Sequence, residues 1–183
     1  MLFLAFLACD QGDTAEPVDT GTQSIVHPCF VEEPILRIGE GDTDFVPFSE
    51  TPEAMMIHGP QGGWHILVSF ELENAMDIVE VQYQITHLDS GVMVSQNNYR
   101  LAIVSTAECA GYYPGMYGYL RVVELYDGNL DTPPELLAGD ILRIDLRVND
   151  CSVQLQNEGW CTPEERWIEA SLDVIAILDP IDE

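Results

Sequence analysis

The chain has 183 residues and a formal net charge of −26, with 6 basic residues, all arginine, against 32 acidic ones. A surface this acidic repels phosphate backbones, which excludes nucleic acid as a partner. Hydrophobic residues make up 46% of the chain, which is ordinary for a folded protein and excludes an acidic disordered polymer.

The chain opens with an apolar run from Met1 to Ala8 that ends at Cys9, and polar, acidic residues follow at once. This pattern resembles the lipobox of secreted bacterial lipoproteins, in which a small residue precedes a cysteine that is acylated. Phe6 stands where leucine is usual, and no basic residue precedes the run. The resemblance implies that residues 1–9 are a signal remnant ending at an acylated Cys9, with the start codon upstream. The alternative is a buried apolar strand that ends in a structural cysteine.

The next segment is acidic and contains a single β-branched aliphatic residue, Val18. It cannot bury enough apolar surface to offset the entropy lost on ordering, which predicts a flexible tether over residues 10–24. A multiply acylated cysteine before such a tether anchors a domain stably to a membrane. We therefore expect one folded domain over residues 25–183, held at the bacterial cell envelope on the periplasmic face or the outer surface.

The remaining chain alternates apolar and polar residues in short runs bounded by glycine, proline, asparagine and aspartate, which predicts β-strands. In Trp64–Glu73, the clearest run, every even-numbered residue is apolar. The expected strands cover residues 35–38, 45–48, 55–58, 64–73, 78–86, 92–95, 99–104, 119–126, 141–148 and 167–178. From these ten runs we count about eight or nine strands of ordinary length at regular spacing, which predict an all-β, immunoglobulin-like, two-sheet antiparallel β-sandwich. One short helical turn is expected over Pro163–Trp167, with Thr162 as its N-cap.

The sequence GDTDFVPF, followed by MMIHGPQGGWHILVSFEL, resembles the opening of β-sandwich domains in lipoproteins of large-genome Gram-negative bacteria. The shared features are a short strand, an acidic glycine-rich turn, a GPQGGxH loop and a long strand. The resemblance covers residues 34–90. It implies a fold and a cell-envelope address, and it implies no activity.

Four cysteines remain after Cys9, an even number that predicts two disulfides in an exported chain. We favour Cys151–Cys161, because the residues between them form a polar excursion between two strands, and this leaves Cys29–Cys109. There is no C-x₂-C pair, and no histidine lies near Cys151 or Cys161 in the sequence, so the spacing does not fit zinc. Free thiols or metal ligands are the alternative.

The HGPQGGWH loop places His58 and His65 at its two ends, where a hairpin would bring both within reach of one metal ion. Met55, Met56 and Met93 would add soft ligands of the kind that copper(I) prefers. Alternatively the glycines serve the turn, the histidines are ordinary strand residues and the methionines pack in the core.

Two acidic glycine-containing turns, Gly39–Asp44 and Asp127–Asp131, offer carboxylates and backbone carbonyls that suit calcium. Both lack the spacing of an EF-hand, which favours solvated turns instead. The acidity of the whole chain fits adaptation to salt or solubility, with a cation-binding or cationic-partner role as the alternative.

Residues 111–119 are rich in glycine and tyrosine and are expected to form a loop. Exposed Tyr112, Tyr113 and Tyr117 would bind a glycan or a protein, because tyrosine presents an apolar body and a polar tip. In the alternative interpretation, Tyr112 and Tyr113 cover the end of the sandwich next to Cys109.

The sequence contains no G-x-S-x-G, H-E-x-x-H or P-loop motif, and no pair of carboxylates stands out for acid–base chemistry. We therefore expect no enzyme and no required cofactor. The expected function is that of a lipid-anchored envelope protein with a structural or adhesive binding role. The alternative is an envelope protein that binds copper through His58 and His65, and a hydrolase is a third class.

Overall fold

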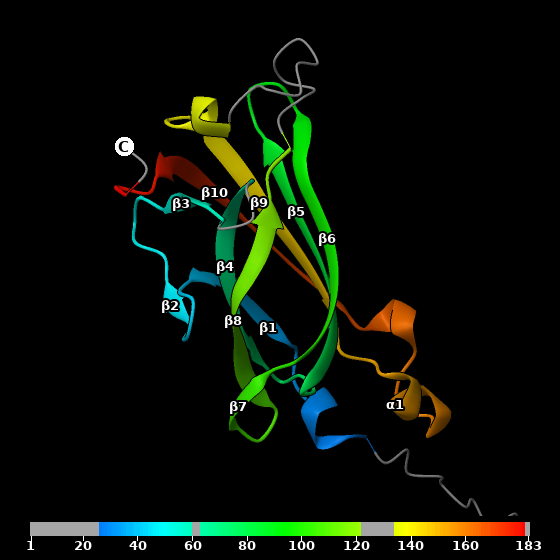
Figure 1. The fold of residues 1–183 in the computed structure, drawn as a ribbon. Coiled ribbons are helices and arrows are strands. Elements are labelled where there is room, and N and C mark those ends of the chain that lie inside the picture. The colour runs from blue at the N-terminus through cyan, green and yellow to red at the C-terminus, as the bar shows by residue number, and fades with distance from the viewer. Residues whose placement is uncertain (1–25, 60–62, 122–133, 182–183) are drawn as a thin grey trace, which may run out of the picture.

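The computed structural model describes residues 26–59, 63–121 and 134–181 (Figure 1). The predictions for Cys9, the tether and the acidic turn at 127–131 lie outside these residues. The described strands are β1 (Ile35–Glu40), β2 (Val46–Pro47), β3 (Glu53–His58), β4 (Trp64–Glu73), β5 (Ile78–His87), β6 (Val92–Ala102), β7 (Val104–Ala107), β8 (Ala110–Tyr119), β9 (Ile141–Asn149) and β10 (Trp167–Leu178). The helical elements are η1 (Pro28–Phe30), η2 (Pro134–Leu137), α1 (Val153–Asn157) and η3 (Pro163–Glu165).

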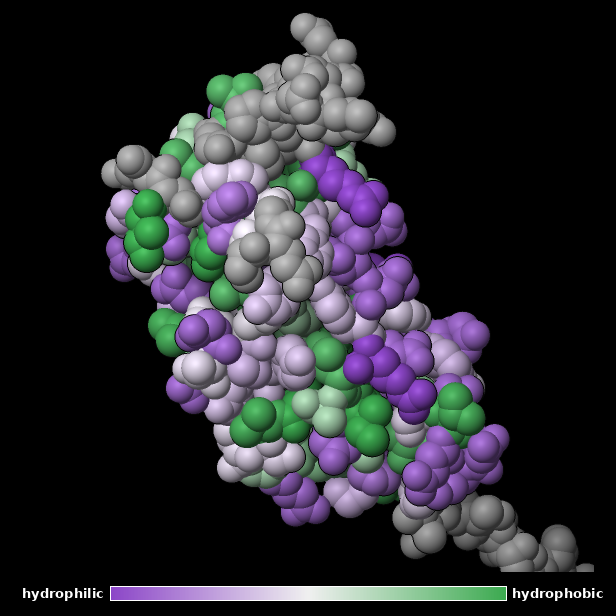
Figure 2. Space-filling model, in the orientation of Figure 1, coloured by the Kyte–Doolittle hydropathy of each residue, from purple (hydrophilic) through white to green (hydrophobic). Residues whose placement is uncertain are grey.

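The strands form two layers, as predicted for an immunoglobulin-like sandwich (Figure 1). In the first layer the strand order is β2-β1-β4-β8-β7, where β2 has only two residues, and in the second it is β10-β9-β5-β6. With β1, β4, β7 and β8 as strands A, B, D and E, and β5, β9 and β10 as strands C, F and G, the layers have the ABED and CFG orders of immunoglobulin domains. Strand β3 joins the layers, because it pairs antiparallel with β4 and parallel with β10. This parallel pair is a local departure from the otherwise antiparallel pattern. Figure 2 shows one side of the molecule, where hydrophilic and hydrophobic residues are interspersed.

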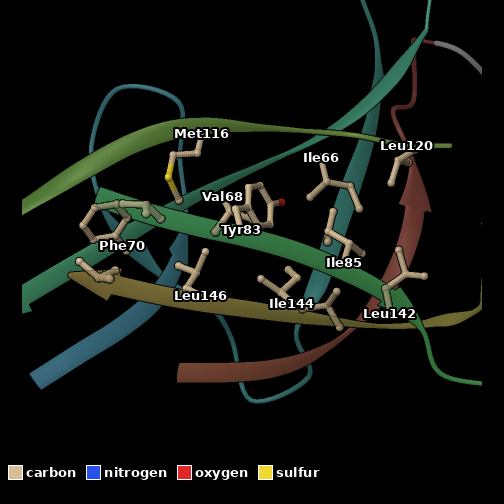
Figure 3. Packing of buried hydrophobic residues seen from close by; sticks show 14 of the residues in the cluster. Ile66, Val68, Phe70, Tyr83, Ile85, Met116, Leu120, Leu142, Ile144 and Leu146 are labelled. Carbon is tan, nitrogen blue, oxygen red and sulfur yellow. The ribbon is translucent and has the colours of Figure 1, made fainter. Parts of the chain in front are cut away.

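The core lies between the layers and is built by the alternation read from the sequence. The even-numbered residues of β4 from Trp64 to Leu72 are buried on its inner face. Alternate residues of β5 and β9 face them from the second layer (Figure 3). Among the largest buried side chains are Phe70, Tyr83, Ile85, Met116, Leu142, Ile144 and Leu146. Each such aliphatic or aromatic side chain stabilises the fold by about 1.5–3 kcal/mol through removal from water.

The prediction of a glycine- and tyrosine-rich loop over residues 111–119 is wrong, because these residues belong to strand β8. It pairs with β4 along nearly the whole length of β4. Gly118 belongs to the inner face of β8, where a Cβ atom would lie 2.6 Å from the Tyr83 hydroxyl oxygen. Gly115 has a φ of +62° where the register between β8 and β4 shifts. The glycines that resemble loop residues therefore allow close packing and a bulge within a strand.

Three further elements differ from the predicted pattern. The runs 92–95 and 99–104 belong mostly to one strand, β6. The strand expected over 119–126 does not begin at residue 119, because β8 ends there, and residues 122–126 lie outside the described part. Helix α1 replaces part of the predicted polar excursion, and its Ser152 side chain accepts a hydrogen bond from the amide of Leu155. The turn η3 forms where it was expected, but the side chain of Thr162 makes no capping hydrogen bond.

Both predicted disulfides are confirmed. Cys29–Cys109 joins η1 to the turn between β7 and β8, across 80 residues of sequence. Cys151–Cys161 closes the segment that contains α1. Next to this segment, Asp150 is fully buried and pairs with Arg166, whose guanidinium also lies 4.1 Å from the centre of the Phe30 ring. The structure therefore ties η1 and the α1 segment to the same end of the sandwich (Figure 1).

The buried hydroxyl of Tyr83 yields a stability prediction. It is the one buried side-chain oxygen or nitrogen in the described residues without a hydrogen-bond partner, and burial raises the pKa of this phenol well above its ordinary value. Because an unsatisfied buried hydroxyl costs free energy, Tyr83→Phe is expected to raise the free energy of unfolding by about 1 kcal/mol. Urea unfolding measures this. Tyr99→Phe is the control and should reduce stability, because the Tyr99 hydroxyl donates to the carbonyl of Tyr117. A lower free energy of unfolding for Tyr83→Phe than for the natural chain would contradict the prediction.

Candidate functional site

The outer side of β3, β4 and β8 brings together five uncharged side chains. The register pairs His65 with Tyr119 and Leu67 with Tyr117 between β4 and β8, and pairs Ile57 with His65 between β3 and β4. Because side chains alternate along a strand, these residues share the face opposite the core. We call this surface the aromatic face and define it as Ile57, His65, Leu67, Tyr117 and Tyr119.

The rings of the aromatic face lie close to one another. The centres of the Tyr117 and Tyr119 rings are 6.1 Å apart, and their planes are within 18° of parallel. The His65 ring centre lies 4.9 Å from that of Tyr117 and 6.1 Å from that of Tyr119. The three rings therefore form one aromatic cluster, held on paired strands.

The histidine and the tyrosines differ in their exposure. His65 is only 7% exposed, whereas Tyr117 is 47% exposed and Tyr119 is 54% exposed. Burial is the main cause that holds the pKa of His65 below the ordinary value of 6.5, and the neighbouring His58 lowers it further. The imidazole is therefore neutral at pH 7, and the aromatic face carries no formal charge there.

Strand β6 supports the aromatic face from behind. The hydroxyl of Tyr99, on β6, donates a hydrogen bond to the backbone carbonyl of Tyr117. Burial is the main cause that raises the pKa of Tyr99, so this phenol stays protonated and remains a donor. The side-chain hydroxyls of Tyr117 and Tyr119 have no hydrogen-bond partner among the described residues. The face is thus fixed through its backbone, and its two tyrosine side chains are about half exposed.

The three tyrosines predicted as a binding group have different surroundings. Tyr117 lies on the aromatic face, as described above. The Tyr112 hydroxyl donates to Asp44 Oδ1 at 3.0 Å, and this hydrogen bond is the main cause that raises the pKa of Tyr112. Tyr113 packs on the core side, with its ring stacked 6.2 Å from that of Phe70. The sequence reasoning missed Tyr119, although its spacing of two residues from Tyr117 is the signal of a shared strand face.

The two predicted metal-binding histidines lie on neighbouring strands but on opposite faces. His58 is opposite Trp64, with ring centres 5.1 Å apart, whereas His65 is opposite Ile57. Of the methionines, Met56 is buried in the core, and Met55 and Met93 are exposed. Among the residues that the structure describes, no group of three or more His, Cys, Asp or Glu side chains is placed to hold a metal ion. Copper binding stays a prediction.

The acidic turn at Gly39–Asp44 is bonded to β8. The Gly41 carbonyl accepts a hydrogen bond from the amide of Gly115 at 3.1 Å, and Asp44 accepts one from Tyr112. These contacts use a carbonyl and a carboxylate that the sequence offered as calcium ligands. The turn thus fixes the position of β8, and calcium binding stays a prediction.

A second polar group, which the sequence reasoning missed, links β5 to the start of β9. His87 is buried, with its Nδ1 2.8 Å from Ser90 Oγ and its Nε2 3.1 Å from Asp140 Oδ2. Although serine, histidine and aspartate also make hydrolase triads, Ser90 Oγ here accepts the Val92 amide, and the Gly91 amide is bonded to the His87 carbonyl. We interpret these contacts as structural: they fix the conformation of the β5–β6 turn and hold it to the start of β9.

Comparison with known proteins adds little to this geometry. No family model matches the chain, and no curated protein matches it. Among solved structures, the chain is similar to an immunoglobulin-like protein from Pseudomonas aeruginosa, with 11% sequence identity and a TM-score of 0.34. The match covers 79% of this chain and 97% of that one. The fold assignment rests on the strand order given above and not on this similarity. No helix in the described ranges is long and apolar enough to cross a membrane.

Proposed function

We propose that this protein is a lipid-anchored binding module of the bacterial cell envelope, with a structural or adhesive role and no catalysis of its own. The observation that carries the proposal is the aromatic face, an uncharged cluster of rings with two half-exposed tyrosines. Tyrosine is enriched at binding surfaces because one side chain offers a large apolar area and a hydroxyl at a low entropy cost.

The disulfides and the lipobox-like N-terminus support the envelope location. Two disulfides fit a chain that folds in an oxidising compartment such as the periplasm or the cell surface. The sequence Phe6-Leu7-Ala8-Cys9 resembles a lipoprotein processing site. A tether and an acyl anchor would hold the sandwich near a membrane while leaving its outer faces free.

The anchor is tested by replacing Cys9 with serine. We expect the natural chain, expressed from its own gene in a Gram-negative bacterium, to partition into the detergent phase of a Triton X-114 extract. Because Cys9→Ser removes the acylation site, this variant should move to the aqueous phase. Ser24→Ala is the control and should partition like the natural chain. Unchanged partitioning of Cys9→Ser would contradict the proposed anchor.

The binding role is tested on isolated bacterial envelopes. We expect the full chain, solubilised in a polyoxyethylene detergent, to bind the envelopes, and Tyr117→Ala/Tyr119→Ala to weaken binding by roughly tenfold or more, because truncating central aromatic side chains commonly costs over 1 kcal/mol each. Tyr112→Ala is the matched control, since it removes a partly exposed tyrosine on the same strand outside the aromatic face. Co-sedimentation gives the affinities, and thermal unfolding verifies that the variants are folded. Equal binding by the double variant would contradict the role of the aromatic face.

A further inference from the structure

The aromatic face has the chemistry of a surface for an uncharged, hydroxyl-rich ligand. Its rings supply apolar area, and the phenol groups of Tyr117 and Tyr119 can each donate and accept a hydrogen bond. The neutral ring of His65 lies beside both. Sugar rings present apolar C–H faces and polar hydroxyls together, and this combination matches such a surface.

The charge of the protein opposes an anionic ligand. The net charge of −26 produces a negative field that repels phosphate, sulfate and carboxylate groups. Most of the arginines already pair with carboxylates, namely Arg37 with Glu71 and Glu73, Arg143 with Asp173, Arg147 with Glu169, and Arg166 with Asp150. The aromatic face contains no cation that would compensate an anionic group. The ligand is therefore not an anion.

The size of the aromatic face favours a sugar chain over a protein. A stable protein interface needs roughly 20–30 residues on each side. The aromatic face has five residues, and on β4 and β8 it gives way to the polar pairs of Glu71 with Arg37 and of Tyr112 with Asp44. A few sugar rings need much less area, and stacking on two tyrosine rings together with hydrogen bonds to their hydroxyls would hold them.

We propose that the aromatic face binds a neutral glycan. This inference rests on the proposed function and specifies its ligand class. Tyr117 and Tyr119 provide the stacking surface, and the buried ring of His65 packs against both of them. Tyr99 positions the strand by bonding to the carbonyl of Tyr117 without contacting the ligand.

Affinity electrophoresis of the full chain in a polyoxyethylene detergent tests the ligand class. The gels contain dextran, laminarin, galactomannan or hydroxyethylcellulose as neutral polysaccharides, and polygalacturonate as an anionic one. We expect at least one neutral polysaccharide to retard the chain and polygalacturonate to have no effect. Tyr117→Ala/Tyr119→Ala should raise the dissociation constant at least tenfold, whereas Tyr112→Ala should leave it unchanged. Retardation that is equal in the double variant would overturn the proposal.

Treated envelopes separate this inference from the proposed function. Periodate, which cleaves sugar diols, should abolish the binding that depends on Tyr117 and Tyr119, whereas protease treatment should leave it intact. If protease abolishes that binding and periodate does not, the ligand is a protein; the glycan inference then fails and the proposed function stands. If neither the envelopes nor any neutral polysaccharide binds the chain, both fail.

Discussion

Replacing Asp150 with alanine is expected to lower the free energy of unfolding by about 3–5 kcal/mol, because it leaves a nearly buried guanidinium without its counter-charge. The Asp150 carboxylate is fully buried and accepts hydrogen bonds from Arg166 Nε at 2.8 Å and from its terminal nitrogen at 2.7 Å. It also accepts the Met76 amide at 3.1 Å. One carboxylate therefore connects the end of β9, the β4–β5 connection and the segment before β10.

Urea unfolding with the disulfides intact measures this loss. Asp173→Ala is the matched control, because Asp173 also receives two hydrogen bonds from one arginine, Arg143, but on an exposed face. An exposed ion pair contributes only about 0–1 kcal/mol, so the control should lose little stability. Similar losses in the two variants would show that burial of the Asp150–Arg166 pair is unimportant.

Removing the Cys29–Cys109 disulfide by the double replacement Cys29→Ser/Cys109→Ser is expected to lower the free energy of unfolding by about 4.5 kcal/mol. The chain-entropy relation gives this value for a closed loop of 80 residues, and it gives about 2.7 kcal/mol for the separation of 10 residues in Cys151–Cys161. The longer loop matters more because its closure removes more freedom from the unfolded chain. Unfolding of the two double variants in urea compares the losses, and a larger loss without Cys151–Cys161 would contradict the prediction.

The strands were predictable where one face is buried and the other is solvated. Alternation in Trp64–Glu73 marks a strand whose even-numbered residues face the core, and the structure has this strand with the same bounds. The sandwich follows from many such runs at regular spacing. Local alternation cannot specify pairing, and so it did not reveal that β3 pairs parallel with the last strand of the chain.

Strand β8 was not predicted from the sequence, because its glycines and proline are residues that are also common in loops. The inner-face position of Gly118 is set by the Tyr83 side chain, which comes from β5, far away in sequence. No local pattern carries that information. Helix α1 was missed for a different reason: its five residues are too short for helical periodicity, and the Ser152 cap is its main local signal.

The candidate site joins residues that sequence reasoning had assigned to two separate hypotheses. His65 was a metal-ligand candidate and Tyr117 a partner-binding candidate. The register of β4 with β8 places them 4.9 Å apart, and it adds Tyr119 opposite His65. Because register depends on long-range pairing, the composition of each segment could suggest the residue types but not their assembly into one face.

Ring-resolved NMR of the full chain, with labelled tyrosine and histidine, tests the central claim most directly. The neutral polysaccharides named above are added in turn, and the ring signals are followed. We expect one of them to shift the signals of Tyr117, Tyr119 and His65 and to leave those of Tyr112 and Tyr83 in place. Shifts confined to Tyr112 or to residues outside the aromatic face, or no shift with any neutral polysaccharide, would contradict the account.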